Sequence, residues 1–337
     1  METMNLQQQL FDVIKKRAGE NIPVAEEVAK LLDISSDSAY RRIRGEKNIS
    51  LDELNKLCNH YRISLDRLMS IQTGGFIFQG QLIERNKFRF EAYLTGLMNN
   101  IAYFNSCKEK EIYYLCKDFP IFHHFHFREI AAFKYFFWMK TLLQDPDFRD
   151  RKFSFDQYPD ELFAIGEKFL AIYNQVPSYE IWNAESINNM VRQVEYYRDM
   201  GVFESDKDAL ILYETFEKLI GHMEKQAAAG YKFAFGDPGR KSIGPFQMYF
   251  NEILIGDNNL LVIIDRVKIS FISNNIFNYI MTRDSTFNEN TYNYVQNLMK
   301  KSTMISSVSE KDRAKFFKLL NDKITRRKKA LNILKAI

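Results

Sequence analysis

Apolar residues in the first seventy positions recur at the spacing of short helices. Runs with apolar residues three or four positions apart cover about residues 6–18, 24–32, 36–44, 51–61 and 64–69. Residues that cap helices stand at their ends. Ser35 precedes the third run, Gly45 follows it, and Ser50-Leu51-Asp52-Glu53 has the form of a capping box for the fourth. The pattern predicts five short helices within residues 1–70.

Beyond residue 70 the pattern predicts a larger, mostly helical region with some strand. Gln72-Thr73-Gly74-Gly75 lies in a predicted linker at 71–79. Apolar runs between Gln247 and Ser273, separated by turn residues, predict a small antiparallel β-meander near 247–273. Phe76-Ile77-Phe78 and Glu111–Leu115 are weaker strand candidates. The predicted fold class is mainly α, with an α+β second domain at 80–337. Its helices are expected at about 87–105, 127–144, 160–176, 184–200, 206–229, 288–301 and 309–336.

The composition is that of packed domains. Hydrophobic residues make up 46% of the 337 residues and aromatic residues 15%, which argues against disorder. No apolar run approaches the length of about 18 residues that spans a bilayer, so no membrane partner is expected. Cys58, Cys107 and Cys116 have neither zinc spacing nor a disulfide pattern. We therefore expect reduced thiols and a cytoplasmic location.

The charge is unevenly distributed. Residues 1–70 carry 11 basic and 11 acidic side chains, whereas residues 294–337 carry 12 basic and 3 acidic ones. An argument for nucleic-acid binding must therefore depend on where individual cations lie. The basic C-terminal segment can be a surface helix docked on the core or on a second subunit, a membrane-surface helix, or an auxiliary DNA contact.

Four landmarks in the first 70 residues occur in a familiar order. They are Val28–Ser35, Arg41–Gly45, Ile49–Leu54 and Ile63–Leu68. With these landmarks, residues 6–70 resemble the Xre family, whose members have the lambda-repressor-like helix-turn-helix fold. The resemblance implies a sequence-specific DNA-binding domain whose third helix lies in the major groove. It covers about a fifth of the chain, and no family is recognised for residues 80–337.

The register of the third helix decides which side chains would reach DNA. If Ala39 and Ile43 point into the core, the outward face includes Ser36, Asp37, Tyr40 and Arg41, the predicted base contacts. A register shifted by one residue would instead bury Tyr40 with Ile43 and turn Arg41 and Arg42 outward. The family usually has an apolar residue at position 42 and a polar one at 43, so both registers stay open. The predicted phosphate contacts are Arg42, Arg44 and Lys47.

Other candidate chemistry is weaker. His123, His124 and His126 lie in a Phe-rich segment. In an extended chain His124 and His126 would share a face and could bind a metal, but packed core histidines are the favoured explanation. Phe133–Trp138 could line a ligand pocket or be ordinary core. The sequence contains no phosphate-binding glycine pattern, GxSxG or HExxH, so we expect neither an enzyme nor a cofactor.

Together these features predict a transcription regulator. The first domain would bind double-stranded DNA as part of a homodimer, and residues 80–337 would dimerise and could respond to an unidentified effector. The alternatives are a protein-interaction module with a helix-turn-helix fold that does not bind DNA, a peptide-responsive regulator of helical-repeat type, or an enzyme with a DNA-binding head.

Overall fold

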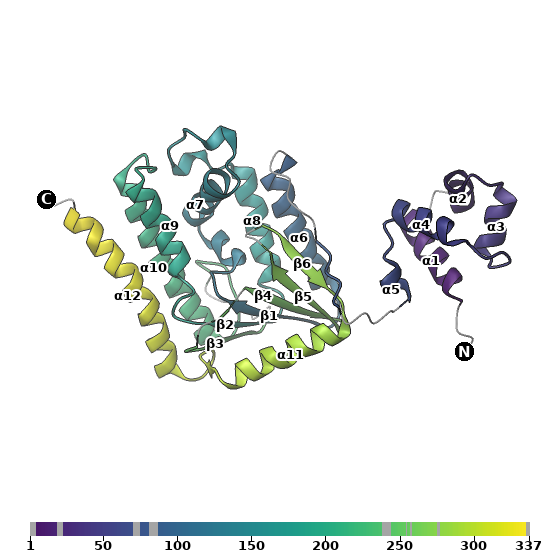
Figure 1. The fold of residues 1–337 in the computed structure, drawn as a ribbon. Coiled ribbons are helices and arrows are strands. Elements are labelled where there is room, and N and C mark those ends of the chain that lie inside the picture. Colours follow the sequence, from purple (N-terminus) through teal and green to yellow (C-terminus); the bar gives the residue numbers. More distant parts are fainter. Residues whose placement is uncertain are drawn as a thin grey trace. The chain divides into compact units, whose positions relative to one another are not determined.

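The chain folds into two compact units, Met1–Gly75 (unit 1) and Phe76–Ile337 (unit 2). The computed structural model describes residues 5–18, 23–69, 75–80, 87–237, 244–253, 255–256, 258–274 and 277–334. Both units are shown as ribbons in Figure 1. Residues 71–74 of the predicted linker at 71–79 lie outside the described residues. The chain combines many helices with a mixed sheet, as expected for a mainly helical protein with an α+β part.

Unit 1 has helices in all five of the ranges that the hydrophobic pattern predicts. Leu10, Phe11 and Ile14 form the buried stripe of the first helix, at the spacing of one helix face. Leu57 and Val28 complete a small core between the helices. The helices are α1 (Leu6–Ala18), α2 (Val24–Leu32), α3 (Ser36–Ile43), α4 (Leu51–His60) and α5 (Leu65–Met69).

Local capping explains where α3 and α4 begin. The Ser35 hydroxyl accepts a hydrogen bond from the backbone N–H of Ser38 at 3.3 Å. Ser50 and Glu53 form the predicted capping box, in which each side chain accepts from the other's backbone N–H. Gly45 follows α3 with a φ of +79°, a conformation that costs glycine little. These signals are local, which is why the sequence reveals them.

Unit 2 is built on a seven-stranded mixed sheet with the order β6-β5-β4-β1-β2-β3-β7 among the described residues. Its three central strands are parallel: β1 pairs with β2, and β2 pairs with β3. The connections between them contain helices, as parallel pairing requires. The strands are β1 (Lys110–Cys116), β2 (Ser178–Trp182), β3 (Phe246–Phe250), β4 (Asn259–Ile264), β5 (Val267–Ser273), β6 (Tyr279–Thr282) and β7 (Thr303–Met304).

The predicted meander at 247–273 is wrong. β4 and β5 do form an antiparallel hairpin, and its turn is Asp265-Arg266, both with positive φ as a tight hairpin turn needs. β3, however, is separated from β4 in the sheet by β1 and β2. The prediction failed because neighbours in sequence were taken as neighbours in the sheet. The parallel partners come from segments more than 60 residues apart, for which no local pattern exists.

Helices cover both faces of this sheet (Figure 1). The main core lies on the face covered by helices such as α6, α8 and α10, whereas α11 packs over β4 and β5 on the other face. The last helix, α12, packs along α10. The α-helices of unit 2 are α6 (Phe90–Ser106), α7 (Arg128–Phe137), α8 (Asp160–Tyr173), α9 (Asn188–Asp199), α10 (Asp206–Ala229), α11 (Ser285–Lys300) and α12 (Glu310–Leu334). Shorter helical turns are η2 (Ile121–His126), η3 (Trp138–Leu142), η4 (Pro146–Phe148) and η5 (Phe155–Gln157).

Candidate nucleic-acid interface

The third helix of unit 1 presents one polar face to solvent. Ser36 and Asp37 are exposed in its first turn. One turn later Tyr40 is 49% exposed and the Arg41 side chain 53% exposed. All four predicted base-contacting residues therefore lie on the accessible surface of α3.

The burial pattern distinguishes between the two possible registers of α3. Ala39 is fully buried in the core, and Ile43 packs partly against the same core. The shifted register would require Tyr40 to be buried, but its ring is half exposed. The structure therefore has the first register, in which Tyr40 and Arg41 face outward.

Arg42 does not lie where the sequence placed it. We expected a phosphate contact on the surface, but Arg42 is only 5% exposed. Its Nε and Nη2 atoms donate to the two carboxylate oxygens of Glu53 at 3.1 and 2.7 Å, and its Nη1 donates to the Ser38 carbonyl at 3.1 Å. This forked ion pair joins α3 to the start of α4 and is unavailable to a phosphate. The pKa of Glu53 is lowered, mainly because its carboxylate accepts these hydrogen bonds from Arg42.

Arg44 and Lys47 remain on the surface, together with one acidic neighbour. The Arg44 side chain is 60% exposed, and Lys47 is exposed. Glu46 lies 3.3 Å from the Arg44 guanidinium and 3.8 Å from that of Arg41. Exposed pairs of this kind contribute little and are easily exchanged for another anion. Arg41, Arg44 and Lys47 are thus available for phosphates, although Glu46 competes for two of them.

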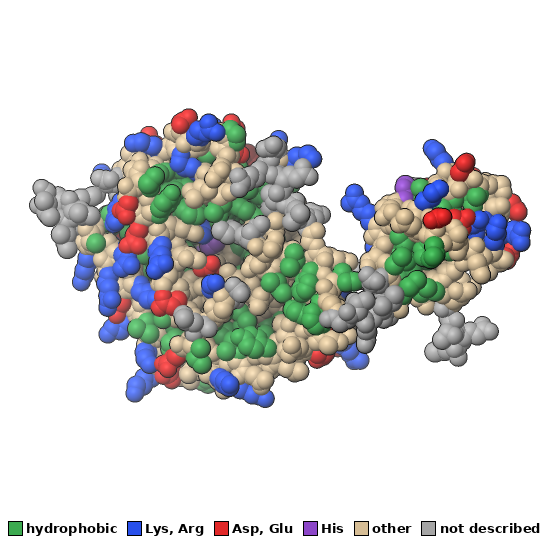
Figure 2. Space-filling model, in the orientation of Figure 1, with side chains coloured by type: hydrophobic (Ala, Val, Ile, Leu, Met, Phe, Trp, Pro, Cys, Tyr) green, Lys and Arg blue, Asp and Glu red, His purple; other side chains and the backbone are tan. Residues whose placement is uncertain are grey.

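Gln7 on α1 holds the segment that carries Lys47. Its Nε2 donates to the carbonyls of Arg42 and Lys47 at 2.7 and 2.8 Å, and its Oε1 accepts from the N–H of Ile49 at 3.1 Å. These bonds hold the chain between α3 and α4 against α1. The sequence analysis missed this role, because the partners are some 40 residues away. Figure 2 shows Lys and Arg side chains gathered on unit 1 at the α3 end.

The histidine segment of unit 2 forms η2 and is not the extended chain considered above. His123 Nε2 lies 3.0 Å from Oε1 of Glu180, which is fully buried on β2. Trp182 Nε1 donates to Glu180 Oε2 at 2.8 Å, and the Tyr173 hydroxyl donates to Oε1. Burial acts to raise the pKa of Glu180, but His123, Tyr173 and the nearby Lys232 together lower it. The sequence analysis missed this cluster, since its members come from four separate segments.

The other histidines of unit 2 have buried ring nitrogens or buried rings. Desolvation holds the pKa values of His124 and His126 well below their usual range, and lowers the pKa of His222 to about 4. The described residues contain no group of three or more His, Cys, Asp or Glu arranged to hold a metal ion. Cys116 is buried and lies on β1.

The basic C-terminal helix is paired within unit 2. Lys323 lies 2.9 Å from Glu185, and Lys328 lies 2.9 Å from Glu217 on α10. On the same helix, Leu320 and Ile324 are fully buried against the core. The helix is docked on its own core, and part of its charge is neutralised there. No helix among the described residues is long and apolar enough to cross a membrane.

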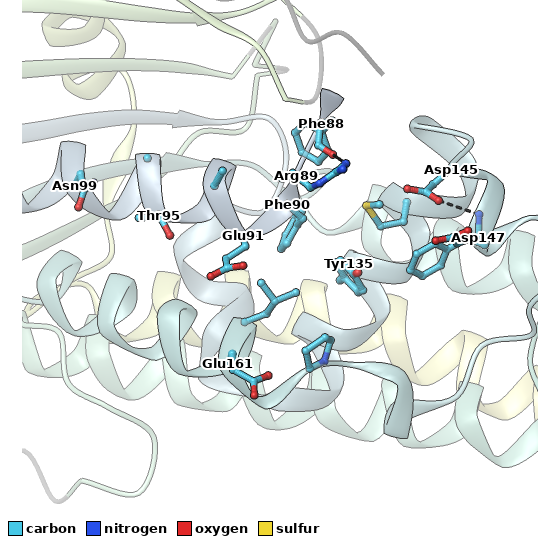
Figure 3. A pocket seen from close by; sticks show the side chains of 16 residues that line it. Phe88, Arg89, Phe90, Glu91, Thr95, Asn99, Tyr135, Asp145, Asp147 and Glu161 are labelled. Atoms are coloured by element: carbon cyan, nitrogen blue, oxygen red, sulfur yellow. Dashed lines mark hydrogen bonds between the residues drawn. The ribbon is translucent and has the colours of Figure 1, made fainter. Parts of the chain in front are cut away.

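A pocket of about 1020 Å³ lies beside α6 in unit 2 (Figure 3). The aromatic run Phe133–Trp138 contributes Tyr135 to it, whereas Phe133 and Phe136 are core residues. Asp145 accepts a hydrogen bond from the N–H of Asp147 and so caps its own short helical turn. The charged lining residues are Arg89, Glu91, Asp145, Asp147 and Glu161.

Comparison of the chain with protein-family models, with curated proteins and with solved structures finds no match.

Proposed function

We propose that this chain is a DNA-binding protein that reads double-stranded DNA through α3, and more specifically a transcription regulator whose unit 1 is a lambda-repressor-like helix-turn-helix domain similar to the Xre family. One observation carries the proposal. The face of α3 that would enter a major groove is free of core packing and carries Tyr40 and Arg41. Arginine suits guanine because its guanidinium can donate two parallel hydrogen bonds to the base edge.

The residues divide between reading bases and holding the backbone. Ser36, Asp37, Tyr40 and Arg41 would contact bases, and Arg44 and Lys47 would contact phosphates. Arg42 is not among the proposed phosphate contacts, because its guanidinium is paired with Glu53. Arg42 would instead hold α3 at a fixed angle to α4, so that the outward residues of α3 face the DNA together.

Unit 2 would supply dimerisation and a response to an effector. A single recognition helix covers only a few base pairs, and two helices held by a dimer cover two half-sites. A bare DNA-binding head would not need the 262 further residues of Phe76–Ile337.

Sequencing genomic fragments retained by the purified full chain tests the proposal, followed by affinity measurements on the recovered site. Arg41→Ala should cost about 1–3 kcal/mol on that site and relax the preference at one base position. Lys47→Ala should weaken binding to all sequences alike. Lys16→Ala removes the same charge from an exposed position on α1 and is the matched control. No enriched sequence, or an Arg41→Ala variant with wild-type affinity and preference, would contradict the proposal.

A second candidate is a protein-interaction module. It is favoured by Glu46, which neutralises part of the α3 surface, and by Leu51, which is 82% exposed at the start of α4. Salt separates the two candidates. DNA binding through several phosphates makes log affinity fall linearly with log salt, by about 0.9 per contact. An interaction module would show no such dependence on any DNA.

A further inference from the structure

A second pocket in unit 2, of about 690 Å³, lies between α6 and the β4–β6 side of the sheet. Tyr93 and Phe104 reach it from α6, and Phe271 and Met281 reach it from β5 and β6. Figure 1 shows α6 beside this part of the sheet. The volume is in the range of about 300–1,000 Å³ that is typical of small-molecule sites.

The chemistry of this lining differs from that of the pocket in Figure 3. None of the described residues that line it carries a charge, whereas the other pocket has five charged side chains. Its walls are aromatic and aliphatic. Its polar groups are amides and phenols, among them Asn100, Asn278 and Tyr279.

Tyr114 lines the pocket and is only 4% exposed. Its side chain is hydrogen-bonded to that of Tyr279. Burial raises the pKa of Tyr114 well above its usual value, so the phenol stays uncharged. The pocket therefore has hydrogen-bonding groups in its lining and no ionised group among the described residues that line it.

We propose that this pocket binds a neutral, mostly apolar small molecule with an aromatic ring and one or two hydrogen-bonding groups. Apolar walls remove water from a ligand, and an ionised ligand would lose its hydration without finding an opposite charge among the described lining residues. Aromatic side chains stack with rings, and the amides and phenols fix orientation. The inference concerns unit 2 alone; under the proposed regulator function, this ligand would be the effector.

The test uses two dyes that differ by one charge. N-phenyl-naphthylamine is neutral, and anilinonaphthalene sulfonate is the same ring system with a sulfonate. Titration of the full chain, followed by dye fluorescence, should show at least about tenfold tighter binding of the neutral dye, because the sulfonate would be buried unpaired. No DNA is present, so a negative result with the dyes would not contradict the DNA-binding proposal. A negative result in the DNA-binding experiment would likewise not contradict the pocket proposal.

Variants on α6 locate the binding. Asn100 lines this pocket and not the one in Figure 3, so Asn100→Trp places a ring at this pocket alone. Gly96 lines both pockets, and Gly96→Phe adds a side chain where a Cβ has open space around it. Tyr103→Trp, on the same helix at a 55% exposed position outside the lining, is the control. Both filling variants should weaken the neutral dye by about tenfold or more, and the control should not. Equal binding of the two dyes, absence of binding, or filling variants that bind like the control would overturn the proposal.

Discussion

Arg42 is the residue that ties the recognition surface of unit 1 to its fold. Its guanidinium is held by both oxygens of Glu53, and the same carboxylate accepts the N–H that opens α4. One acidic side chain thus completes a capping box and an ion pair at once. Loss of Arg42 would leave Glu53 partly buried without its cation, which costs more than loss of an exposed pair.

Arg42→Ala should therefore destabilise unit 1, by about 1.5–3 kcal/mol, because the hydrogen bonds of a largely buried, charged pair are lost. Arg44→Ala removes an equal charge from an exposed site and should change stability by less than about 0.5 kcal/mol. Far-UV circular dichroism of residues 1–75 during urea unfolding measures both. Equal stability of the two variants would mean that the Arg42–Glu53 pair is not a structural link.

Arg42 also shows what the sequence could not predict about single residues. The outward positions of Tyr40 and Arg41 follow from the helical period once Ala39 is assigned to the core. Arg42 could not be placed in this way, since its position depends on Glu53 eleven residues later, on another helix. Helical spacing predicts which face a residue occupies, but a long side chain can reach inward to a partner.

At the scale of elements, signals within one segment were sufficient for helices. α10, expected at 206–229, spans Asp206–Ala229, with Ser205 as its cap and Gly230 after its end. Strands were harder. β2 falls in the gap between two expected helices. The segment Ser178–Trp182 is short, and its polar residues Ser178 and Glu180 are buried, so it lacks the continuous apolar run that is typical of a buried parallel strand. Its two neighbours in the sheet are distant in sequence, so nothing local indicates the pairing.

The docking of α12 on α10 leads to a prediction with a matched pair of leucines. Leu320 is fully buried, whereas its neighbour Leu319 is 38% exposed. Leu320→Ala should lower the free energy of unfolding of unit 2 by about 2–5 kcal/mol, and Leu319→Ala by less than about 1 kcal/mol. Tryptophan fluorescence during urea unfolding reports unit 2 alone, because both tryptophans, Trp138 and Trp182, lie in it. Similar losses in the two variants would show that α12 is not docked through this face.

At the scale of the whole molecule, the buried histidines make the stability of unit 2 depend on pH. His124, His126 and His222 have lowered pKa values and are neutral in the folded state at neutral pH. The unfolded chain takes up their protons near pH 6.5. The unfolded state thus binds more protons, and stability should fall as the pH drops from about 6.5 to 5, by on the order of 1 kcal/mol per pH unit for each such histidine.

Urea unfolding at several pH values, followed by tryptophan fluorescence, measures this slope. His222→Gln removes one of the three groups and should make the slope shallower. His60→Gln removes a partly exposed histidine of unit 1 and is the control. A slope of zero between pH 6.5 and 5 would mean that the buried histidines are protonated in the folded protein.

The division into two units leads to a prediction about DNA affinity. Unit 1 has its own core of Leu10, Ile14, Val28 and Leu57, and its own helix caps, so residues 1–75 should fold alone. Unit 1 alone has a single recognition helix, α3, and one such helix rarely gives tight binding. In the full chain, two copies of unit 1 would be joined through a dimer of unit 2. Once the first copy is bound to DNA, binding of the second copy is then intramolecular. Avidity gained in this way is about 10²–10⁴-fold without any new contact.

The full chain should therefore sediment as a dimer, protect a two-fold symmetric site with half-sites about one helical turn or a multiple apart, and bind it far more tightly than residues 1–75. Fusing residues 1–75 to an unrelated dimeric coiled coil is the control. It should recover most of the affinity if unit 2 contributes only dimerisation, because the same two recognition helices are joined again. A full chain that sediments as a monomer while residues 1–75 bind equally well would contradict the dimeric regulator, whatever the sequence bound. If the fusion recovers nothing although the full chain is a dimer, unit 2 must itself position the two recognition helices, since joining them is then not sufficient.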